Sequence, residues 1–284
     1  MPKYTSFTPP KAIKLKDKSI DFSTAIVMGI LNLTSDSFFD GGKYNNEHAI
    51  ITQVQLMLDE GATIIDIGAQ SSRPGASSIS AEEEIRRLEP IIKLLKDSFS
   101  NIIISIDTFS AKVAACCVRA GADIINDISA GELDNEMIDT IAKLQVPYII
   151  MHMQGKPDTM QNNPTYSNVS KEILDYFANK IELLQSKGIE QIIIDPGFGF
   201  GKTIAHNYQL LNNLDTFQKF GIPVLAGTSR KSMIYKLLEQ DPSAAINGTT
   251  VTNTIALLNG ANILRVHDVK QAQECIKITT FAKK

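Results

Sequence analysis

The stretch IIIDPGFGFGK, residues 192–202, joins an aliphatic run to an acid and a glycine-rich turn. A short run of β-branched residues predicts a buried strand, and Asp195 stands where that strand would end. The turn is not a phosphate-binding loop, because Pro196, which has no N–H group, occupies the position where that motif needs a glycine. Its glycines also miss the dinucleotide-binding spacing by one residue. The stretch therefore predicts a strand that delivers an acid to a tight turn.

The rest of the chain repeats this arrangement of an apolar run followed by polar residues. Seven further runs have the same near-continuous apolar character: 25–31, 63–68, 101–107, 123–128, 146–152, 222–227 and 262–267. Such runs are typical of parallel strands that are covered on both faces. Eight strand–helix units in this length favour a (β/α)8 TIM barrel over an open doubly wound sheet, which is the alternative. We expect one barrel domain over residues 21–284, with residues 1–20 as a short extension that plugs its base.

The segments between these runs carry helix signals. Ser80 and Glu83 have the spacing of a capping box at the start of a helix. Pro90 is expected to kink or divide that helix, because proline lacks the N–H group that the helix interior needs. The region 231–259 predicts two helical pieces separated at residues 241–242.

The composition excludes several classes of protein. The net charge of -3 and the isoelectric point near 5.9 give no overall attraction to nucleic acid. No apolar run reaches the roughly 18 residues of a membrane span, and the first residues lack the apolar core of a signal peptide. The cysteines, Cys116, Cys117 and Cys275, do not have metal-ligand spacing. We expect a cytoplasmic protein with reduced cysteines and no nucleic-acid or membrane partner.

Polar side chains follow nearly every predicted strand. They are Asn32, Gln70, Ser71, Ser72, Asp107, Asn126, His152, Gln154, Asp195, Ser229, Arg230, Lys231, Arg265 and His267. Each one alone has an ordinary explanation as the cap of the next helix, and Asp127 and Asp268 fit that explanation better. Caps do not explain why two acids, a lysine and an arginine would meet at the end of a barrel where the strands' carboxyl ends converge. We therefore expect a binding site there.

The chemistry of these side chains indicates the kind of ligand. Two acids, an asparagine and a lysine suit a flat heterocycle whose edge carries paired N–H donors beside a carbonyl group. Arg265 and His267 are two residues apart on an extended segment, so they would point the same way and grip an anion. Asn32 would offer a neutral oxygen to a Mg²⁺ ion that is also bound to phosphate. We see no cluster of His, Cys and acidic residues that would predict a metal site built by the protein alone.

Eight short motifs stand in order along the chain. They are MGILNLTSDSFFDGG (28–42), GAQSSRPGA (68–76), SIDTFS (105–110), INDIS (125–129), MHMQG (151–155), DPGFGFGK (195–202), TSRKS (228–232) and RVHD (265–268). Together they resemble the dihydropteroate synthase family. The resemblance implies a barrel that joins 6-hydroxymethyl-7,8-dihydropterin diphosphate to p-aminobenzoate, with release of pyrophosphate, in folate biosynthesis. It also implies Mg²⁺, a homodimer, and a site that sulfonamides enter as mimics of p-aminobenzoate.

The resemblance also implies roles for the residues that match these motifs. The residues implied to contact the pterin are Asp107, Asn126, Met151, Asp195 and Lys231. Those implied to bind the diphosphate are Arg265 and His267, with Asn32 as the Mg²⁺ contact. Those implied around p-aminobenzoate and in the mobile first loop are Ser72, Arg73, Pro74, Phe200, Ser232, Asp36 and Phe38. The residues implied to take part in catalysis are Asp107, Asp195, Lys231 and Arg265.

Two departures from the family pattern lie in its loops. Ser35 stands where the family commonly has proline. Ala69, Gln70 and Ser72 stand where it commonly has glycine, glutamate and threonine. We expect these changes to affect loop movement and p-aminobenzoate affinity more than the pterin site.

Lys202, at the end of the glycine-rich turn, is predicted to be a solvated residue at the start of a helix. Lys231 is then the better candidate for contact with the substrate.

Two functions other than the synthase are also compatible with these residues. One is a folate-dependent methyltransferase barrel, which would not need the Arg265 and His267 pair and usually works with a cobalamin module that this chain lacks. The other is a non-catalytic pterin-binding protein.

Overall fold

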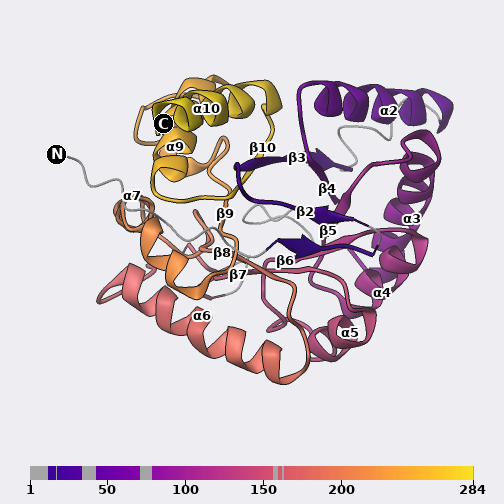
Figure 1. Ribbon diagram of the computed structural model, residues 1–284, viewed down its shortest axis with the longest axis horizontal. Coiled ribbons are helices and arrows are strands. Elements are labelled where there is room, and N and C mark those ends of the chain that lie inside the picture. The colour runs from indigo at the N-terminus through magenta and orange to yellow at the C-terminus, as the bar shows by residue number, and fades with distance from the viewer. Residues whose placement is uncertain are drawn as a thin grey trace.

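The computed structural model describes residues 12–16, 18–33, 43–70, 79–155, 159–161 and 163–283, with only the backbone for residues 43–45. Its main feature is an eight-stranded sheet surrounded by helices (Figure 1). The strands of this sheet are β3 (Ile26–Asn32), β4 (Ile64–Gly68), β5 (Ile104–Asp107), β6 (Ile124–Asp127), β7 (Tyr148–Met151), β8 (Ile192–Asp195), β9 (Leu225–Ala226) and β10 (Ile263–Val266). Each of the eight apolar runs in the sequence therefore forms one strand.

The sheet closes into a barrel. Its strand order is β8-β7-β6-β5-β4-β3-β10-β9, and neighbouring strands are parallel. The two end strands meet at a parallel bridge between Ile194 and Val224, where the N–H of Ile194 donates to the carbonyl of Pro223 at 3.0 Å. The prediction of a (β/α)8 barrel is confirmed, and the open sheet is excluded because its edges would not meet.

Helices follow one another around the outside of this barrel (Figure 1). They are α2 (Lys43–Asp59), α3 (Ala81–Ser98), α4 (Ala111–Ala120), α5 (Met137–Leu144), α6 (Val169–Ser186), α7 (Ile204–Asn212), α8 (Ser232–Tyr235), α9 (Ile246–Leu258) and α10 (Val269–Ala282). Two 3-10 helices are η1 (Leu214–Phe220) and η2 (Pro242–Ala244). None of the described helices is long and apolar enough to cross a membrane.

Helix α3 corrects half of the prediction that Pro90 would kink or divide it. It begins where expected, because Ser80 is its N-cap and the Ser80 side chain accepts a hydrogen bond from the backbone N–H of Glu83. It then continues to Ser98 as a single helix, so Pro90 does not divide it. Pro90 is exposed, and on that side water can bond to the carbonyl group that proline leaves without a partner.

The barrel interior is closed at its base by a hairpin. Strands β1 (Ile13–Lys14) and β2 (Ser19–Ile20) pair antiparallel, and in Figure 1 the hairpin lies across the middle of the ring of strands. Its apolar side chains pack in one buried cluster with the first inward-facing residues of the barrel strands, which are Met28, Ile64, Ile124, Ile149, Ile193, Leu225 and Ile263. A separate, larger cluster joins the outward faces of the strands to the helices. The described part of the N-terminal extension therefore acts as a plug.

Candidate active site

A polar layer lies directly above the aliphatic layer inside the barrel. Side chains alternate between the two faces of a strand, so the residue two positions after each interior aliphatic residue also faces the interior. Two of these seven positions hold Ile30 and Gly227, and the five that concern the site hold Asp66, Asn126, Met151, Asp195 and Arg265. Asp107 belongs to the same layer, because it pairs in register with Asn126 on the neighbouring strand. All of the residues that concern the site except Asp66 were singled out from the sequence.

Arg265 links the acids of this layer. Its Nε donates to Oδ2 of Asp66 at 2.7 Å, and its Nη2 donates to Oδ2 of Asp107 at 2.7 Å. The amide of Asn126 also donates to Oδ2 of Asp66, at 3.1 Å. Asp66 is fully buried, whereas the side chains of Asp107 and Arg265 are 18% and 20% exposed. The arrangement neutralises the buried acid Asp66 and leaves Asp107 and Arg265 partly exposed.

Burial sets the proton affinities in this network. It raises the pKa of Asp107 to about 6, against the lowering by the charge of Arg265, and the nearby Asp66 raises it further. For Arg265 burial acts to lower the pKa, but Asp66 and Asp107 outweigh it and raise the pKa above its ordinary value. Arg265 is therefore a permanent cation, and Asp107 takes up a proton close to neutral pH.

Asp195, Lys231 and Arg265 lie together around Gly227, where a Cβ would be 3.7 Å from Nζ of Lys231 and 3.9 Å from both Oδ2 of Asp195 and Cβ of Arg265. Asp195 is 6% exposed, and its Oδ1 accepts a hydrogen bond from the N–H of Gly197 at 2.8 Å. Burial raises the pKa of Asp195, although Lys231 and this hydrogen bond oppose the shift. Burial also lowers the pKa of Lys231 to about 8, against the attraction of Asp195. A carboxylate, a second carboxylate and an ammonium group thus border one space at the mouth of the barrel.

The turn after Asp195 needs glycine at two points. Gly197 and Gly201 have positive φ angles of 72° and 61°, which residues with a Cβ rarely adopt. A Cβ on Gly197 would lie 2.0 Å from the carbonyl oxygen of His152, and one on Gly201 would lie 2.3 Å from that of Gln154. The turn therefore lies directly on the chain that leaves β7. Its Phe200 ring faces Lys231, whose Nζ is 4.8 Å from the ring centroid.

Lys202 corrects the sequence prediction. It is 3% exposed, not solvated. Its Nζ contacts Nδ1 of His152 at 3.1 Å and donates to the carbonyl oxygens of Gly197 at 2.9 Å and Phe200 at 3.0 Å. The prediction was wrong because the glycine turn folds back over the lysine. Burial lowers the pKa of Lys202 to about 7 and that of His152 to about 3, so His152 is neutral and its Nδ1 can accept a hydrogen bond from Nζ of Lys202.

The proposed anion-binding side lies at the ends of β9 and β10. Nδ1 of His267 lies 3.0 Å from Oγ of Ser229, and that oxygen also accepts from the backbone N–H of His267 at 3.2 Å. Arg230 makes a two-pronged ion pair with Asp268, through Nε at 3.0 Å and Nη2 at 2.5 Å. His267 is exposed and follows Arg265 by two residues, so both face the mouth of the barrel. Asp268 is thus an ion-pair partner.

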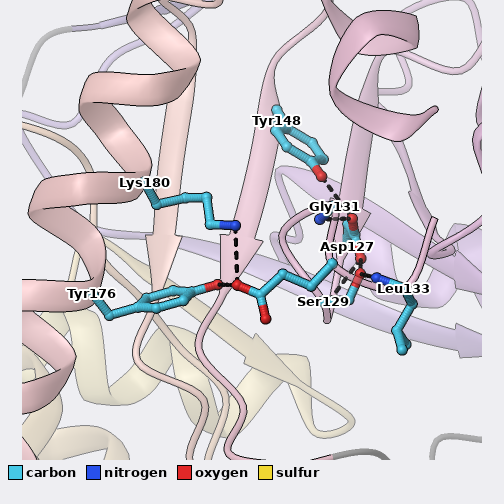
Figure 2. Close-up of polar contacts among 8 residues, drawn as sticks. Asp127, Ser129, Gly131, Leu133, Tyr148, Tyr176 and Lys180 are labelled. Atoms are coloured by element: carbon cyan, nitrogen blue, oxygen red, sulfur yellow. Dashed lines mark hydrogen bonds and ion pairs between the residues drawn. The ribbon is translucent and has the colours of Figure 1, made fainter. Parts of the chain in front are cut away.

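Asp127 has a structural role, but not as the cap of the next helix, because α5 begins at Met137 and has Glu136 as its N-cap. Figure 2 shows it at the end of β6, where it accepts from the hydroxyl of Tyr148 at 2.6 Å and from the N–H of Gly131 at 2.7 Å. It also accepts from the N–H and the hydroxyl of Ser129, both at 2.7 Å. All of its acceptor capacity is used inside the fold. Its neighbour Asn126 is left to face the interior.

The remaining sequence predictions have different outcomes. Met151 is buried at the end of β7, Ser232 begins α8 directly after Lys231, and Asn32 is exposed at the end of β3. Residues that lie outside the described ranges are Asp36, Phe38, Ser72, Arg73 and Pro74. Within those ranges no group of three or more His, Cys, Asp or Glu side chains lies together as a metal site. The roles of all these residues stay predictions.

Sequence reasoning missed Asp66. It was passed over because it lies within the strand TIIDIG and not at its end. A signal was nevertheless present, since Ile64, Asp66 and Gly68 share one face of that strand and an acid inside a strand that is covered on both faces needs a partner. The partner is Arg265, which is 199 residues away in the chain.

Comparison with known proteins places this chain in a family. A family model described as pterin binding enzyme matches residues 28–267. The chain is 43% identical over 262 residues to dihydropteroate synthase from Escherichia coli, with 92% of each protein covered. The chain belongs to the dihydropteroate synthase family of pterin-binding enzymes. Dihydropteroate synthase from Haemophilus influenzae is also similar, at 45% identity over 264 residues, with 92% of this chain and 95% of that protein covered.

Solved structures of dihydropteroate synthases have the same fold. The Yersinia pestis enzyme, solved with a sulfonamide drug complex, has a TM-score of 0.90 and 41% sequence identity, and covers 96% of this chain and 99% of its own. The Xanthomonas albilineans enzyme, solved with 4-aminobenzoic acid, has a TM-score of 0.89 and 36% identity, and covers 97% and 99%. The resemblance of the eight motifs to dihydropteroate synthases is therefore confirmed over almost the whole chain.

Proposed function

We propose that this protein joins 6-hydroxymethyl-7,8-dihydropterin diphosphate to p-aminobenzoate, giving 7,8-dihydropteroate and pyrophosphate for folate biosynthesis. It would thus be a transferase. The observation that carries the proposal is the polar layer at the mouth of the barrel. There Asp107 and Asp195 lie beside a lysine and an arginine, in a chain that is similar to dihydropteroate synthases throughout.

The pterin would bind between the two acids. Each carboxylate can accept a pair of parallel N–H groups, which the aminopyrimidine edge of a pterin offers. Asn126 would add a donor and an acceptor, and Lys231 would donate to the ring carbonyl. Met151, buried on the interior face between the strands of Asn126 and Asp195, would pack against the ring. Asp66 would hold Arg265 and Asn126 in place, because both donate to its Oδ2.

The diphosphate would bind on the side of Arg265 and His267. Arg265 is the permanent cation of the site, and the two carboxylates that hold it fix its position before the anion arrives. Asn32 suits a Mg²⁺ ion that keeps most of its waters and takes its other oxygens from phosphate, because it is an exposed amide beside this end of β10. When bound, Mg²⁺ would offset the charge of the diphosphate.

The reaction would need no nucleophile from the protein. The bond between the methylene carbon and the diphosphate oxygen breaks, and the oxygen keeps the electron pair as pyrophosphate leaves. Arg265 and His267 would stabilise that negative charge. Asp107 and Asp195 would favour the positive charge left on the methylene and the pterin ring. The amine nitrogen of p-aminobenzoate then bonds to the methylene and loses one proton to solvent.

The p-aminobenzoate would lie beside Phe200 and Ser232, with Ser72, Arg73 and Pro74 as further contacts. Phe200 fits this role because its ring is partly exposed at the mouth and is held in place by the adjacent Lys231. Asp36 and Phe38 would close over the site. Since sulfonamides mimic p-aminobenzoate, we propose that they compete for the same position.

We propose a homodimer in the cytoplasm. Val251 on α9 is 50% exposed, and Ile278 and Phe281 on α10 are 68% and 79% exposed. These two helices pack against each other, so the residues offer an apolar surface that a second copy would cover. Light scattering should give twice the monomer mass, and Phe281→Glu should reduce that mass.

The proposed location in the cytoplasm is supported by the free cysteines, of which Cys117 and Cys275 are buried, because free thiols suit a reducing compartment.

The two alternative functions are less favoured. A folate-dependent methyltransferase has no use for a diphosphate, whereas the described residues Ser229, Arg265 and His267 suit an anion. A non-catalytic pterin-binding protein would not need to keep these residues either. The departures at Ala69 and Gln70 fall at the end of β4, outside the network that binds Arg265.

The test is product formation by the purified protein. Dihydropterin diphosphate, p-aminobenzoate and Mg²⁺ are supplied together and then with each one omitted. Dihydropteroate and pyrophosphate should form in equal amounts, and only in the complete mixture. A protein that binds the pterin tightly without forming product would be the non-catalytic alternative, and one that transfers a methyl group from a folate would be the methyltransferase.

A further inference from the structure

The turn 197–201 is held through its carbonyl groups. Each of its five backbone carbonyl oxygens accepts a hydrogen bond from a side chain. The donors, in chain order, are Lys202 to Gly197, Lys231 to Phe198, Gln161 to Gly199, Lys202 to Phe200 and Tyr166 to Gly201. The conformation of the turn thus depends on two lysines. Lys231 lies on the proposed substrate side of the turn, and Lys202 is the residue that directly follows the turn in the sequence.

Lys202 is the only one of these donors that binds the turn at two points. It also reaches beyond the turn, because its Nζ contacts both the ring nitrogen of His152, at 3.1 Å, and the carbonyl oxygen of His152, at 3.3 Å. An ammonium group has three N–H donors, so four acceptors within 3.3 Å fully occupy it. The lysine therefore fastens the turn after β8 to His152, the residue that follows β7.

The groups at the active site depend on the turn that Lys202 fastens. The N–H of Gly197 orients the carboxylate of Asp195, and the carbonyl of Phe198 receives the ammonium group of Lys231 at 2.5 Å. The ring of Phe200 lies beside the same ammonium group. A displacement of the turn would therefore move an acid, a lysine and an aromatic ring at once.

We propose that Lys202 is a positioning residue for the pterin site, which fixes the turn 197–201 against β7 and thereby aims Asp195 and Lys231. The proposal rests on the pterin-binding function proposed above. Lys202 acts from behind the turn and does not touch the substrate. Burial lowers the pKa of Lys202 to about 7, because the charged form is less stable inside the protein than in water. A lysine in solvent at the start of a helix would not have this shift.

Other charged and titratable groups near Lys202 do not replace it. Asp195 attracts it and Lys231 repels it, while His152 is neutral. The ring of Tyr176 packs edge-on against His152 at 5.0 Å, and His206 completes the capping box at the start of α7. Among the described neighbours of the turn, none of these groups donates to the carbonyls of Gly197 or Phe200. Removing the ammonium group would leave the carbonyl of Phe200 without its partner.

The test compares Lys202→Met with Lys171→Met. Lys171 is a matched control, because it lies at the start of α6 with a side chain that is 72% exposed. Equilibrium binding of a dihydropterin and of pyrophosphate is measured separately, together with turnover. Lys202→Met should weaken pterin binding by at least about ten-fold and leave pyrophosphate binding within about two-fold, since Arg265 is held by Asp66 and Asp107 and not by the turn. Lys171→Met should change neither.

Two further measurements distinguish the loss of the ammonium group from a general loss of folding. In Lys202→Ala, propylammonium replaces the missing atoms and should restore pterin binding, whereas propan-1-ol, which has the same length without the charge, should not. If Lys202→Met does not fold, Lys202→Arg is used, because a planar guanidinium group cannot converge on the same four acceptors. It should give the same split between pterin and pyrophosphate.

The proposal is overturned if pterin affinity is unchanged in these variants, or if pterin and pyrophosphate affinities fall equally, which is the sign of general loss of structure. Wild-type protein separates this result from a failure of the proposed function. A wild-type protein that makes no dihydropteroate contradicts the function, whereas an active wild type with an equally active Lys202→Met contradicts only the role of Lys202.

Discussion

The base and the mouth of the barrel interior are built from the same strands but differ in their side chains, which are aliphatic at the base and mostly polar or charged at the mouth. At the base, Ile64, Ile124, Ile149, Ile193 and Ile263 form a dry aliphatic cluster with the hairpin. Two residues further along these strands the interior holds Asp66, Asn126, Met151, Asp195 and Arg265. One layer gains stability from burial, and the next places charges where burial opposes them.

The difference shows that the polar layer lowers the stability of the fold and places charged groups at the proposed binding site. Burial shifts the pKa of Asp107 and Asp195 upward and those of Lys202 and Lys231 downward, so each of these charges is less favourable inside the barrel than in water. The buried Oδ1 of Asp66 has no hydrogen-bond partner among the described residues. Buried and shifted groups of this kind are typical of functional sites. The base layer shows none of them, so the two layers should respond to mutation in opposite ways.

The largest effect is expected from Asp195→Asn in the polar layer. The amide would still accept from Gly197, but it would present a donor to the N–H groups of the pterin and lose two charge-assisted hydrogen bonds. We expect kcat/KM to fall by roughly 1,000-fold, with a melting temperature no lower than that of the wild type. Steady-state kinetics and thermal unfolding measure the two quantities. Near-normal activity of Asp195→Asn would show that Asp195 does not bind the pterin.

Arg265→Ala should affect both stability and binding. It leaves the buried carboxylate of Asp66 without its cation, which we expect to cost about 3–5 kcal/mol of unfolding free energy. It should also weaken binding of the pterin diphosphate more than that of the same pterin without diphosphate. The control is Arg230→Ala, whose ion pair with Asp268 is more exposed and should cost about 1 kcal/mol or less. Equal losses for both pterins would contradict the role of Arg265 in anion binding.

Ile193→Ala tests the base layer, two residues before Asp195 on the same strand. The change opens a cavity among fully buried aliphatic side chains and should cost about 2–4 kcal/mol of unfolding free energy. The kcat/KM of the folded protein should stay within about three-fold, because the turn and the polar layer keep their contacts. Denaturant unfolding and kinetics at low temperature measure both. A loss of activity as large as that of Asp195→Asn would mean that the layers are not independent.

The smallest effect is a dependence of stability on pH that comes from Asp107. Its folded pKa of about 6 lies above the ordinary 3.8, so between those values the folded protein holds more protons than the unfolded chain. The stability that Asp107 contributes is therefore lost as pH rises from 4 to 6. Relative to the wild type, Asp107→Asn should gain on the order of 2 kcal/mol over this range. Unfolding at both pH values measures the gain.

The control for this pH effect is Ile193→Ala, whose difference from the wild type should be the same at both pH values. An Asp107→Asn variant with that same constant difference would show that Asp107 does not titrate in this window.

The strands could be predicted because they depend on local patterns, whereas their closure into a barrel rests on the bridge between Ile194 and Val224, which no local pattern shows. An aliphatic run such as 192–195 is buried on both faces, and its strand pairing needs only neighbours of the same kind. Pro90 shows the limit of local rules, since proline is tolerated within α3 where it faces solvent.

The candidate site could be predicted in part. Asp107, Asn126, Asp195 and Arg265 were found because a polar residue that ends an apolar run is visible in the sequence. Asp66 was missed and Lys202 was placed in solvent because their partners come from other strands. Asp66 needs Arg265, and Lys202 needs the carbonyl of His152, 50 residues away. Periodicity along one element carries no information on such contacts.

The most direct test of the account is a crystal structure of this protein with a dihydropterin diphosphate analogue that cannot react. We expect the pterin edge to lie within hydrogen-bonding distance of Asp107, Asn126 and Asp195, with the diphosphate at Arg265 and His267. The turn 197–201 should keep its contacts with Lys202. A pterin bound elsewhere, with Asp107 and Asp195 free of it, would contradict the proposed function.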